Sequence, residues 1–576
     1  SKEDEKGYVL PLVLINRFPK AEEKAQEVSG FQLRGHRATP YPPPIPTPLT
    51  ETGQGSEAER GPGKIIGKGK KRESGAGRCK AHVLDGPIEQ ESGWNGPEVA
   101  DTAQQLPKFC PKRAPGLQGF VGVTYSLAQI FRQFFSVTTV RVICCNTNIN
   151  AEKELSKGKK LAWEKLTSDT FLKYIGLLIY MALLKLPRVR DYWRRDSHLS
   201  VHFPVSVMTR DRFMAISRTV HLSNPDDDIE NDRKKGTPDY DPLYRLKPLY
   251  ITIKDTCKSM WQPRKQIAID ERMVATKAKI ALKQYMKAKP IKWGVKLFVL
   301  ADSSNGYTSD FTIYTGKSRF TSSQGLPYDV VSNLIDPSFL GRGYHLYVDN
   351  FYTSPKLFRD LYASGFVACG TFKDSRKNVR ETKQNALTSR SPRGSIRWIR
   401  QNKLLFVKWM DTREVSVCST IHKAFDGDTV TRNVHDKETG SWQIKNIASP
   451  RCVVDYNKYM GGVDLSDQLL QYYSVHKRSN RWYRTLLYHF IDIAATNSYI
   501  LHKEMCLAAQ TVAMSHGQFM EELSRELCGV PKGSDVAPRG AQCLPESLAS
   551  VDEETDSKWE RSRTADTATK GRQYCK

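Results

Sequence analysis

Hydrophobic residues follow a helical period in the first folded part of the chain. Between about residues 120 and 262, apolar positions recur at three- and four-residue spacing, as in SLAQIFRQFF, DTFLKYIGLLIYMALLKL and RDRFMAISRTVHL. This spacing is typical of amphipathic helices. We therefore predict a helical region over residues 116–262.

Beyond residue 263, short apolar runs predict strands that alternate with helices. The predicted order is strand, strand, strand, helix, strand, helix, strand, over residues 266–270, 293–301, 307–315, 327–335, 343–349, 354–364 and 366–372. The turn residues SSNG at 303–306 favour a hairpin between the second and third strands. This order is that of a ribonuclease H-like mixed sheet, in which the fourth strand lies beside the first. We predict an α/β fold with an RNase H-like core whose first part covers residues 263–372.

The core pattern is interrupted before it resumes. Residues 373–455 form a more irregular, basic segment with two β-like runs, SIRWI and LLFVKWM, which we interpret as an inserted β-containing segment. Helical periodicity returns at 455–471 and 481–505, so residues 456–508 are predicted to complete the core by covering the sheet. Over residues 509–576 the pattern weakens into an acidic tail of low order.

Proline and glycine, which interrupt helices and strands, are frequent in the first 115 residues. Runs such as TPYPPPIPTPL and GPGKIIGKGKKR predict a disordered basic arm over residues 1–115. Its cluster of four cations is a candidate nuclear import signal, with a solvated charge run as the alternative: Lys68, Lys70, Lys71 and Arg72.

The charge balance indicates a polyanionic partner. The chain has 88 Lys and Arg against 62 Asp and Glu, a net charge of +26. Charge alone does not choose between DNA, RNA and a membrane surface. The longest apolar run, Tyr174 to Leu184, is too short to span a bilayer, so no membrane partner is expected. No secretory leader is evident, and we interpret the twelve cysteines as reduced thiols.

Three aspartates occupy positions that the predicted fold brings together. Asp270 ends the first predicted strand and Asp349 ends the fourth, so adjacent strands place them side by side. Asp464 follows two glycines at the predicted start of a later helix, and Asp467 shares its face. Glu271 is a further candidate, although neighbouring residues on a strand point to opposite faces.

Convergent aspartates are suited to metal-dependent phosphodiester chemistry. Mg²⁺ prefers oxygen ligands, and phosphodiester cleavage is assisted by two divalent ions about 3.5–4 Å apart. Clustered carboxylates repel one another unless cations neutralise them. Each aspartate alone has a plain explanation as the cap of a turn or helix, but three in these positions favour the metal interpretation. No GxxxxGKS/T, HExxH or GxSxG motif offers other chemistry.

At these residues the sequence resembles the piggyBac transposase family. Six motifs carry the resemblance: IAIDERM, QYMKAKPIKWGVKLFVLADSSNGY, YVDNFYTSP, GTFKDSRK, VVDYNKYMGGVDLSDQ and KRSNRWYRTLLYHFIDIAATNSYIL. The resemblance implies a catalytic, metal-binding triad of Asp270, Asp349 and Asp464, with Asp467 as a further metal-binding aspartate and two Mg²⁺ ions. It also implies a helical dimerisation and DNA-binding region before the core.

The same resemblance implies partners and a reaction. The implied partners are double-stranded DNA with transposon ends and a second copy of the chain in a homodimer. The implied reaction is excision through hairpin intermediates followed by insertion at TTAA targets, and the implied location is the nucleus. The residues expected to contact DNA are Lys287, Lys289, Lys292, Lys373, Arg376, Lys377, Arg478, Arg481 and Trp482. Solvated loop charge is the alternative for the lysines, and core packing is the alternative for the tryptophan.

Two departures from the family pattern leave two functions open. The family's terminal zinc module is absent or truncated, because Cys506, Cys528, Cys543 and Cys575 are widely separated and zinc binding is not expected. Lys373 replaces the usual arginine, which keeps the charge but loses bidentate geometry. The aspartates favour an active transposase. The missing module favours a domesticated nuclear DNA-binding protein without transposition activity, and a nuclease that does not join strands is a third possibility.

Overall fold

The computed structural model describes residues 93–531, except residues 103, 121–124, 197, 199, 288, 317–321, 376–381 and 436–439. Its helices are α2 (Leu127–Phe134), α3 (Val137–Ser156), α4 (Ser168–Leu183), η2 (Val189–Trp193), α5 (Phe203–Val207), α6 (Arg210–Thr219), α7 (Pro225–Arg233), α8 (Lys247–Met260), α9 (Leu326–Leu334), α10 (Pro337–Leu340), α11 (Pro355–Ala363), α12 (Arg451–Tyr459), α13 (Gly462–Tyr472), α14 (Trp482–Ala508) and α15 (His516–Leu527). Its strands are β1 (Cys110–Pro111), β2 (Gly116–Leu117), β3 (Trp261–Gln262), β4 (Gln266–Ala275), β5 (Lys283–Tyr285), β6 (Trp293–Asp302), β7 (Thr308–Ile313), β8 (Gly341–Arg342), β9 (His345–Val348), β10 (Val367–Thr371), β11 (Ile396–Gln401), β12 (Leu404–Met410), β13 (Glu414–Ser419), β14 (Thr429–His435) and β15 (Trp442–Ala448).

A mixed sheet forms the centre of the molecule. Its order in the described residues is β11-β12-β13-β10-β9-β4-β6-β5, with β7 paired to β6. β4 runs antiparallel to β6 and parallel to β9, and β9 runs parallel to β10. The predicted α/β fold with a mixed sheet is therefore confirmed, as is the expected position of the fourth predicted strand beside the first.

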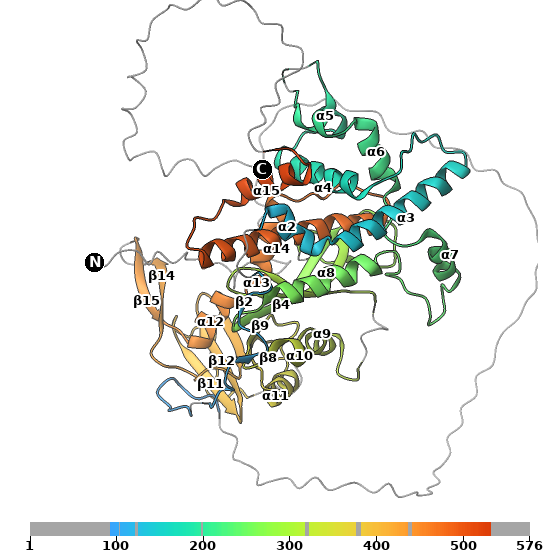
Figure 1. Ribbon diagram of the computed structural model, residues 1–576. Coiled ribbons are helices and arrows are strands. Elements are labelled where there is room, and N and C mark those ends of the chain that lie inside the picture. The colour runs from blue at the N-terminus through green and yellow to red at the C-terminus, as the bar shows by residue number, and fades with distance from the viewer. Residues whose placement is uncertain are drawn as a thin grey trace, which may run out of the picture.

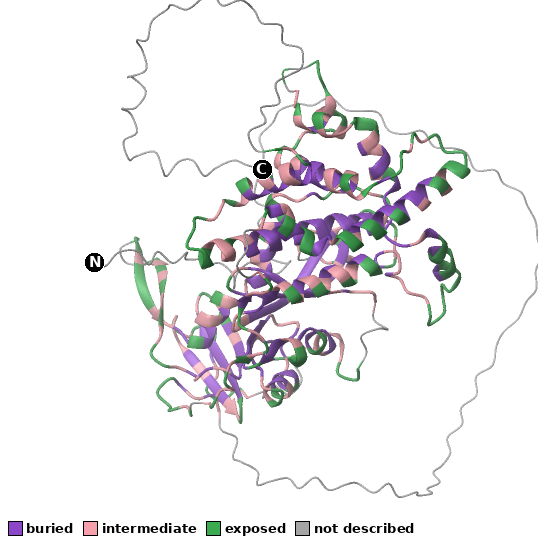
Figure 2. Cartoon of the chain, viewed as in Figure 1, coloured by how far each residue is buried: buried purple, intermediate pink, exposed green. Residues whose placement is uncertain are grey.

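Helices cover both faces of this sheet (Figure 1). On one face, Ile267 and Ile269 of β4 pack with side chains of α9 and α11. On the other face, Leu297 and Val299 of β6 join a large core with α2, α4, α8, α14 and α15. Covering both faces explains why β6 is a nearly continuous apolar run, WGVKLFVLA, interrupted only by Lys296. The long helix α14 is buried along residues 483–501 because it lies between the sheet and the other helices (Figure 2).

The segment expected to be an irregular insertion contributes to the central sheet. Strand β13 pairs antiparallel with β10, and β12 and β11 follow it outward. Every residue of β12 is buried, so these strands cover what would otherwise be an exposed edge at β10. Within the described residues of 373–455, only the β14–β15 hairpin forms a separate sheet.

The described end of the predicted N-terminal arm is folded. The Trp94 side chain is buried and its Nε1 donates to the Thr382 carbonyl at 3.0 Å, while Asn95 forms a bridge with Trp398 of the edge strand β11. Further along, β1 pairs with β8. The prediction of disorder is wrong for the described residues of 93–115, because apolar side chains such as Trp94 and Phe109 pack against distant elements instead of forming a local pattern. The candidate import signal lies outside the described residues.

The tail that was expected to have low order begins with a helix. Ser515 and Gln518 form a capping box at the start of α15. The helix packs against α4 where Gly176 leaves room for it: a Cβ at Gly176 would lie 2.9 Å from the Ser524 carbonyl oxygen. Cys543 and Cys575 lie outside the described residues. No helix in the described part of the chain is both long and apolar enough to cross a membrane.

Candidate metal centre

Two neighbouring strands deliver Asp270 and Asp349 to the same place. The register pairs Ile269 of β4 with Val348 of β9, and each of these two residues is followed in the sequence by an aspartate. β9 ends at Val348, whereas β4 continues to Ala275. The end of β9 therefore opens a gap beside β4 in which carboxylates from both strands can meet.

Three carboxylates meet at this gap. One oxygen each from Asp270, Glu271 and Asp349 all lie within 4.8 Å of one another. The expectation that Glu271 points away from the cluster is wrong. Beyond the end of β9, β4 keeps β6 as its partner on one side but has no paired strand among the described residues on the other, so a long glutamate side chain can approach Asp270 around that open side.

Burial makes it costly to ionise all three carboxylates together. It raises the pKa of Asp270 well above the usual range, and the nearby charge of Glu271 adds to this effect. Burial and Glu271 also raise the pKa of Asp349. Burial opposes ionisation of Glu271 as well, but its hydrogen bond with Asp270 and the Lys296 ammonium, 3.1 Å away, together lower its pKa. Burial and mutual repulsion therefore disfavour full ionisation of the cluster unless further cations approach it.

Lys289 places a positive charge inside the cluster. Its Nζ lies 3.2 Å from Asp270 Oδ2 and donates to the Glu271 carbonyl at 3.1 Å. Burial opposes the charge on Lys289, but Asp270 and Glu271 raise its pKa, and Asp464 contributes in the same direction. In this structure Lys289 therefore neutralises carboxylates. Its predicted contact with DNA remains a prediction.

Asp464 lies in the first turn of α13, as predicted. Two glycines let this helix approach the sheet closely. A Cβ at Gly462 would lie 3.0 Å from Ser303 Cα, and a Cβ at Gly306, whose φ is 75°, would lie 2.9 Å from the Ser466 backbone nitrogen. Asp464 interacts electrostatically with Lys289 but is not among the three carboxylates within 4.8 Å of one another.

Asp467 is engaged by a buried arginine. Arg272 Nε lies 2.5 Å from Asp467 Oδ1, and Arg272 Nη2 donates to Ser466 Oγ at 2.8 Å. Arg272 is two residues after Asp270 on β4, so it reaches the same face of the strand. This network ties α13 to the strand that carries Asp270. The sequence pattern did not single out Arg272, although its spacing from Asp270 was visible.

The other residues predicted to contact DNA lie in different surroundings. Lys287, Lys292, Lys373 and Arg478 are exposed. Arg481 donates to the Tyr483 hydroxyl at 3.2 Å, and Trp482 begins α14 half-buried against the helical core. Arg376 and Lys377 lie outside the described residues. Among the members of this set that the structure describes, only Lys289 contacts the carboxylates.

The donor set fits a hard divalent cation. All three groups offer carboxylate oxygens, which Mg²⁺ and Mn²⁺ prefer to nitrogen or sulfur. A bound cation would also remove the electrostatic cost of ionising carboxylates whose charged forms are disfavoured.

Replacing Lys289 with Met is expected to strengthen Mg²⁺ binding by about tenfold, because an ammonium that competes for Asp270 is removed. The Mg²⁺-induced rise in melting temperature should then exceed that of the unaltered chain. Lys287→Met, at an exposed position two residues away, is the matched control. Equal Mg²⁺ responses in both variants would show that Lys289 does not compete with the cation.

Comparisons with known proteins identify the family of this chain. The family model described as Transposase IS4 matches residues 127–499, more than half of the chain. Human piggyBac transposable element-derived protein 3 is 25% identical over 393 residues, which cover 67% of this chain and 62% of that protein. Human piggyBac transposable element-derived protein 2 is 24% identical over 420 residues, which cover 70% and 66%. The chain thus spans less than two thirds of the length of either relative.

A solved structure shares the fold. The cryo-EM structure of a piggyBac transposase synaptic complex with hairpin DNA superposes with a TM-score of 0.62 at 24% identity, covering 72% of this chain and 83% of that one. The matched family region contains β4, β9 and α13, which carry the aspartates. The chain therefore belongs to the piggyBac-type family of IS4 transposases.

Proposed function

We propose that this chain is a cut-and-paste DNA transposase that cleaves DNA and joins the released ends to TTAA targets. The observation that carries the proposal is the convergence of Asp270, Glu271 and Asp349 at the end of β9 in a chain of this family. The strand order around them supports assignment of an RNase H-like catalytic core. Membership of the family does not by itself establish that this chain cleaves DNA, joins strands or selects TTAA, so each of these steps is part of the proposal.

Asp270, Asp349 and Asp464 would hold two Mg²⁺ ions in this proposal. Such ions assist phosphodiester cleavage by activating the attacking oxygen and stabilising the leaving oxygen. Glu271 lies close enough to Asp270 and Asp349 to contribute a ligand oxygen. Asp467 was predicted to bind metal as well, but its pairing with Arg272 favours a role in holding α13 beside β4.

The cations around the site have two distinct roles in this proposal. Lys289 and Lys296 limit carboxylate repulsion before substrate binds. The exposed Lys287, Lys292 and Lys373 contact phosphates of double-stranded DNA. The exposed Arg478, with Arg481 and Trp482 at the start of α14, supplies further contacts to DNA in this proposal. We also propose that the chain forms a homodimer. This dimer acts in the nucleus on two transposon ends.

An excision assay tests this function. The full chain is incubated with a donor plasmid in which TTAA flanks the terminal repeats of its own element, with Mg²⁺ or with a chelator. We expect hairpin-ended excision products and insertion at TTAA only when Mg²⁺ is present.

Salt-sensitive DNA binding without any cleavage would contradict the proposal. That result would favour the alternative, a domesticated DNA-binding protein, which is consistent with the similarity to two human transposable element-derived proteins. Mg²⁺-dependent cleavage without strand joining would instead indicate a nuclease.

A further inference from the structure

Two exposed aromatic side chains face each other across β5 and β6. Tyr285 pairs directly with Trp293 in the register of these strands, and their ring centroids lie 4.8 Å apart. Tyr285 is 52% exposed and Trp293 is 54% exposed. A single exposed ring is common on protein surfaces, whereas two adjacent rings form an apolar patch of the kind that binds a ligand.

The surroundings of this pair carry charge of one sign. Residues 276–295, which include β5 and the beginning of β6, contain six lysines and no arginine, aspartate or glutamate. Four of these lysines are exposed: Lys277, Lys279, Lys287 and Lys292. Lys283 lies two residues before Tyr285 on β5, and its Nζ is 5.1 Å from the centroid of the Trp293 ring. Aromatic rings among lysines favour a ligand that has both a flat ring and a negative charge.

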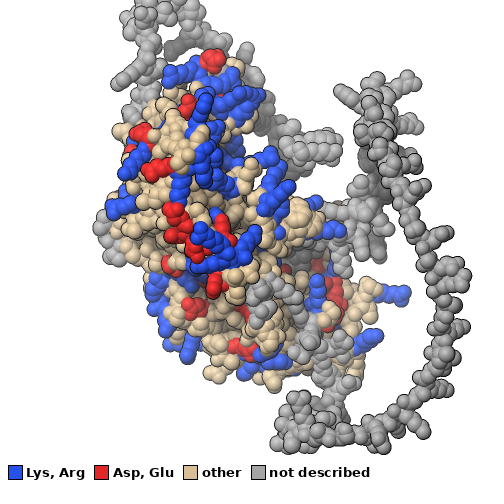
Figure 3. All heavy atoms as spheres, turned by 90° about the vertical axis from the view of Figure 1, so that its right-hand side faces the viewer, with Lys and Arg blue, Asp and Glu red and all other residues tan. Residues whose placement is uncertain are grey.

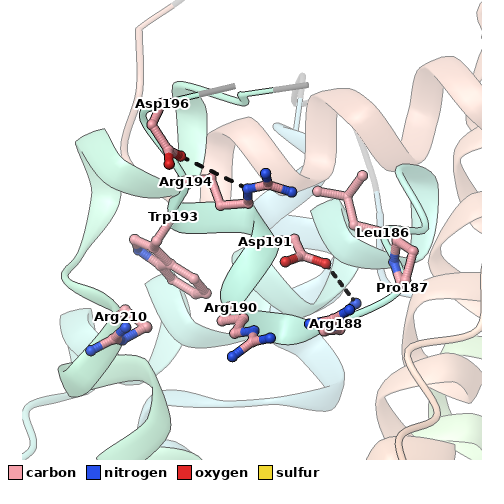
Figure 4. Close-up of a pocket in the computed structure, with 9 residues that line it drawn as sticks. All are labelled: Leu186, Pro187, Arg188, Arg190, Asp191, Trp193, Arg194, Asp196 and Arg210. Atoms are coloured by element: carbon pink, nitrogen blue, oxygen red, sulfur yellow. Dashed lines mark hydrogen bonds and ion pairs between the residues drawn. The ribbon is translucent and has the colours of Figure 1, made fainter. Parts of the chain in front are cut away.

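Positive charge alone does not distinguish this surface from others on the molecule. Lys and Arg gather over the upper part of one side (Figure 3), and a cavity of about 610 Å³ between η2 and α6 is lined by arginines (Figure 4). The aromatic ring in that cavity is already engaged, because Trp193 Nε1 donates to the Met208 carbonyl at 2.8 Å and the ring packs against Phe213. The Tyr285–Trp293 pair instead combines positive charge with half-exposed rings.

The loop that follows Tyr285 links the pair to the carboxylate cluster. A hydrogen bond of 2.9 Å from the Met286 N–H to the Lys292 carbonyl closes this loop beside the pair. In the middle of the loop, Lys289 Nζ lies 3.2 Å from Asp270 Oδ2. The same short segment therefore presents the aromatic rings at its base and contacts the cluster at its centre.

The pair lies within reach of a DNA strand held at the cluster. Val299 of β6 is the partner of Asp270 in β4, and Trp293 precedes Val299 by six residues on the same strand. Six residues of antiparallel strand span about 20 Å. Successive bases of a stacked DNA strand are about 3.4 Å apart, so about six nucleotides cover this distance.

We propose that Tyr285 and Trp293 form a stacking platform for one unpaired nucleobase of the DNA strand that enters the carboxylate cluster. The choice of DNA rests on the proposed function. The requirement for an unpaired base comes from the rings, because bases inside a duplex are stacked on one another and offer no free face. Stacking tolerates every base, so the platform holds an opened strand near the cluster without reading its sequence.

The Lys283 ammonium lies over the ring that the base would cover. An exposed cation–π contact strengthens an interaction by only about twofold to fivefold. Stacking of one base contributes about fivefold to a hundredfold in affinity. The base therefore displaces the ammonium from the Trp293 ring, and the flexible Lys283 side chain moves to a neighbouring phosphate.

The test combines deletion of a base in the DNA with deletion of the rings in the protein. The full chain and a Tyr285→Ala/Trp293→Ala variant are titrated against a duplex with a single-stranded tail, with Ca²⁺ in place of Mg²⁺ to limit cleavage. An abasic site, which keeps the phosphate but lacks the base, is placed at each tail position in turn.

We expect one tail position at which the abasic site weakens binding by the unaltered chain about tenfold. The Tyr285→Ala/Trp293→Ala variant should bind the intact tail about tenfold more weakly than the unaltered chain. An abasic site at the same position should then weaken binding by this variant less than about twofold, because both changes remove the same contact. Trp293→Phe keeps an aromatic ring and should retain most of the affinity.

The matched control is Trp442→Ala, which removes a tryptophan that is 72% exposed on the separate β14–β15 sheet. Equal abasic effects in the unaltered chain and the Tyr285→Ala/Trp293→Ala variant would overturn the proposal, as would an equal loss of affinity in Trp442→Ala. A changed oligomeric state of the double variant with unchanged DNA affinity would overturn it in favour of a protein interface.

The stacking platform and the proposed function can fail separately. An abasic effect that disappears in the double variant, in a chain that does not cleave DNA with Mg²⁺, would support the platform and remove the transposase activity. Mg²⁺-dependent cleavage together with equal abasic effects in both proteins would remove the platform alone.

Discussion

Replacing Asp349 with Asn is expected to reduce Mg²⁺-dependent DNA cleavage at least about a thousandfold, equivalent to about 4 kcal/mol of transition-state stabilisation. Asp349 supplies one of three carboxylates within 4.8 Å of one another, and an amide binds a hard cation far more weakly. The fold should survive, because the Asn carbonyl can still accept the Phe351 N–H that Asp349 accepts at 2.8 Å.

Two measurements check this prediction. Cleavage of the donor plasmid reports the loss of activity, and Mn²⁺ titration followed by electron paramagnetic resonance reports the loss of metal binding. Asp360→Asn, on α11, is the matched control because it removes an ion-paired aspartate outside the cluster. Cleavage by Asp349→Asn within tenfold of the unaltered chain would exclude Asp349 as a required ligand.

Replacing Arg272 with Ala is expected to lower the free energy of unfolding by about 3–5 kcal/mol. The Arg272 side chain is only 3% exposed and bonds to Asp467, Ser466 and Thr308. Its removal leaves Asp467 without its cation in a site that is 26% exposed, and leaves the hydroxyls without a donor. Because the network joins α13 to β4, the variant should also cleave DNA more slowly under conditions in which it remains folded.

A double-mutant cycle measures this coupling. Denaturant unfolding of Arg272→Ala, Asp467→Asn and the combined variant should show that the two single losses are not additive. Arg233→Ala removes an exposed arginine paired with Glu230 and should cost less than about 1 kcal/mol. Additive losses at Arg272 and Asp467 would show that their contact contributes little to stability.

Local pattern was sufficient to predict the elements that carry the aspartates. The strand that contains Asp270, the strand before Asp349 and the helix beginning near Asp464 lie where apolar periodicity indicated them, although β4 continues beyond its predicted end at Asp270 to Ala275. The adjacency of β4 and β9 followed from the order of strands and helices, because few sheet topologies accommodate that order. The same pattern did not predict that β11–β13 extend the sheet, since a strand's partner is not encoded in its own period.

Local pattern predicted the strands and the helix that carry Asp270, Asp349 and Asp464, because alternation and helical spacing are local properties of the chain. The roles of Glu271 in the cluster, of Lys289 in neutralising it and of Arg272 in holding Asp467 became visible only in the folded chain. The tertiary structure also decided that the described residues of 93–115 are folded against distant strands. These outcomes depend on contacts between residues far apart in the chain, and on where one strand ends beside another, which no local pattern records.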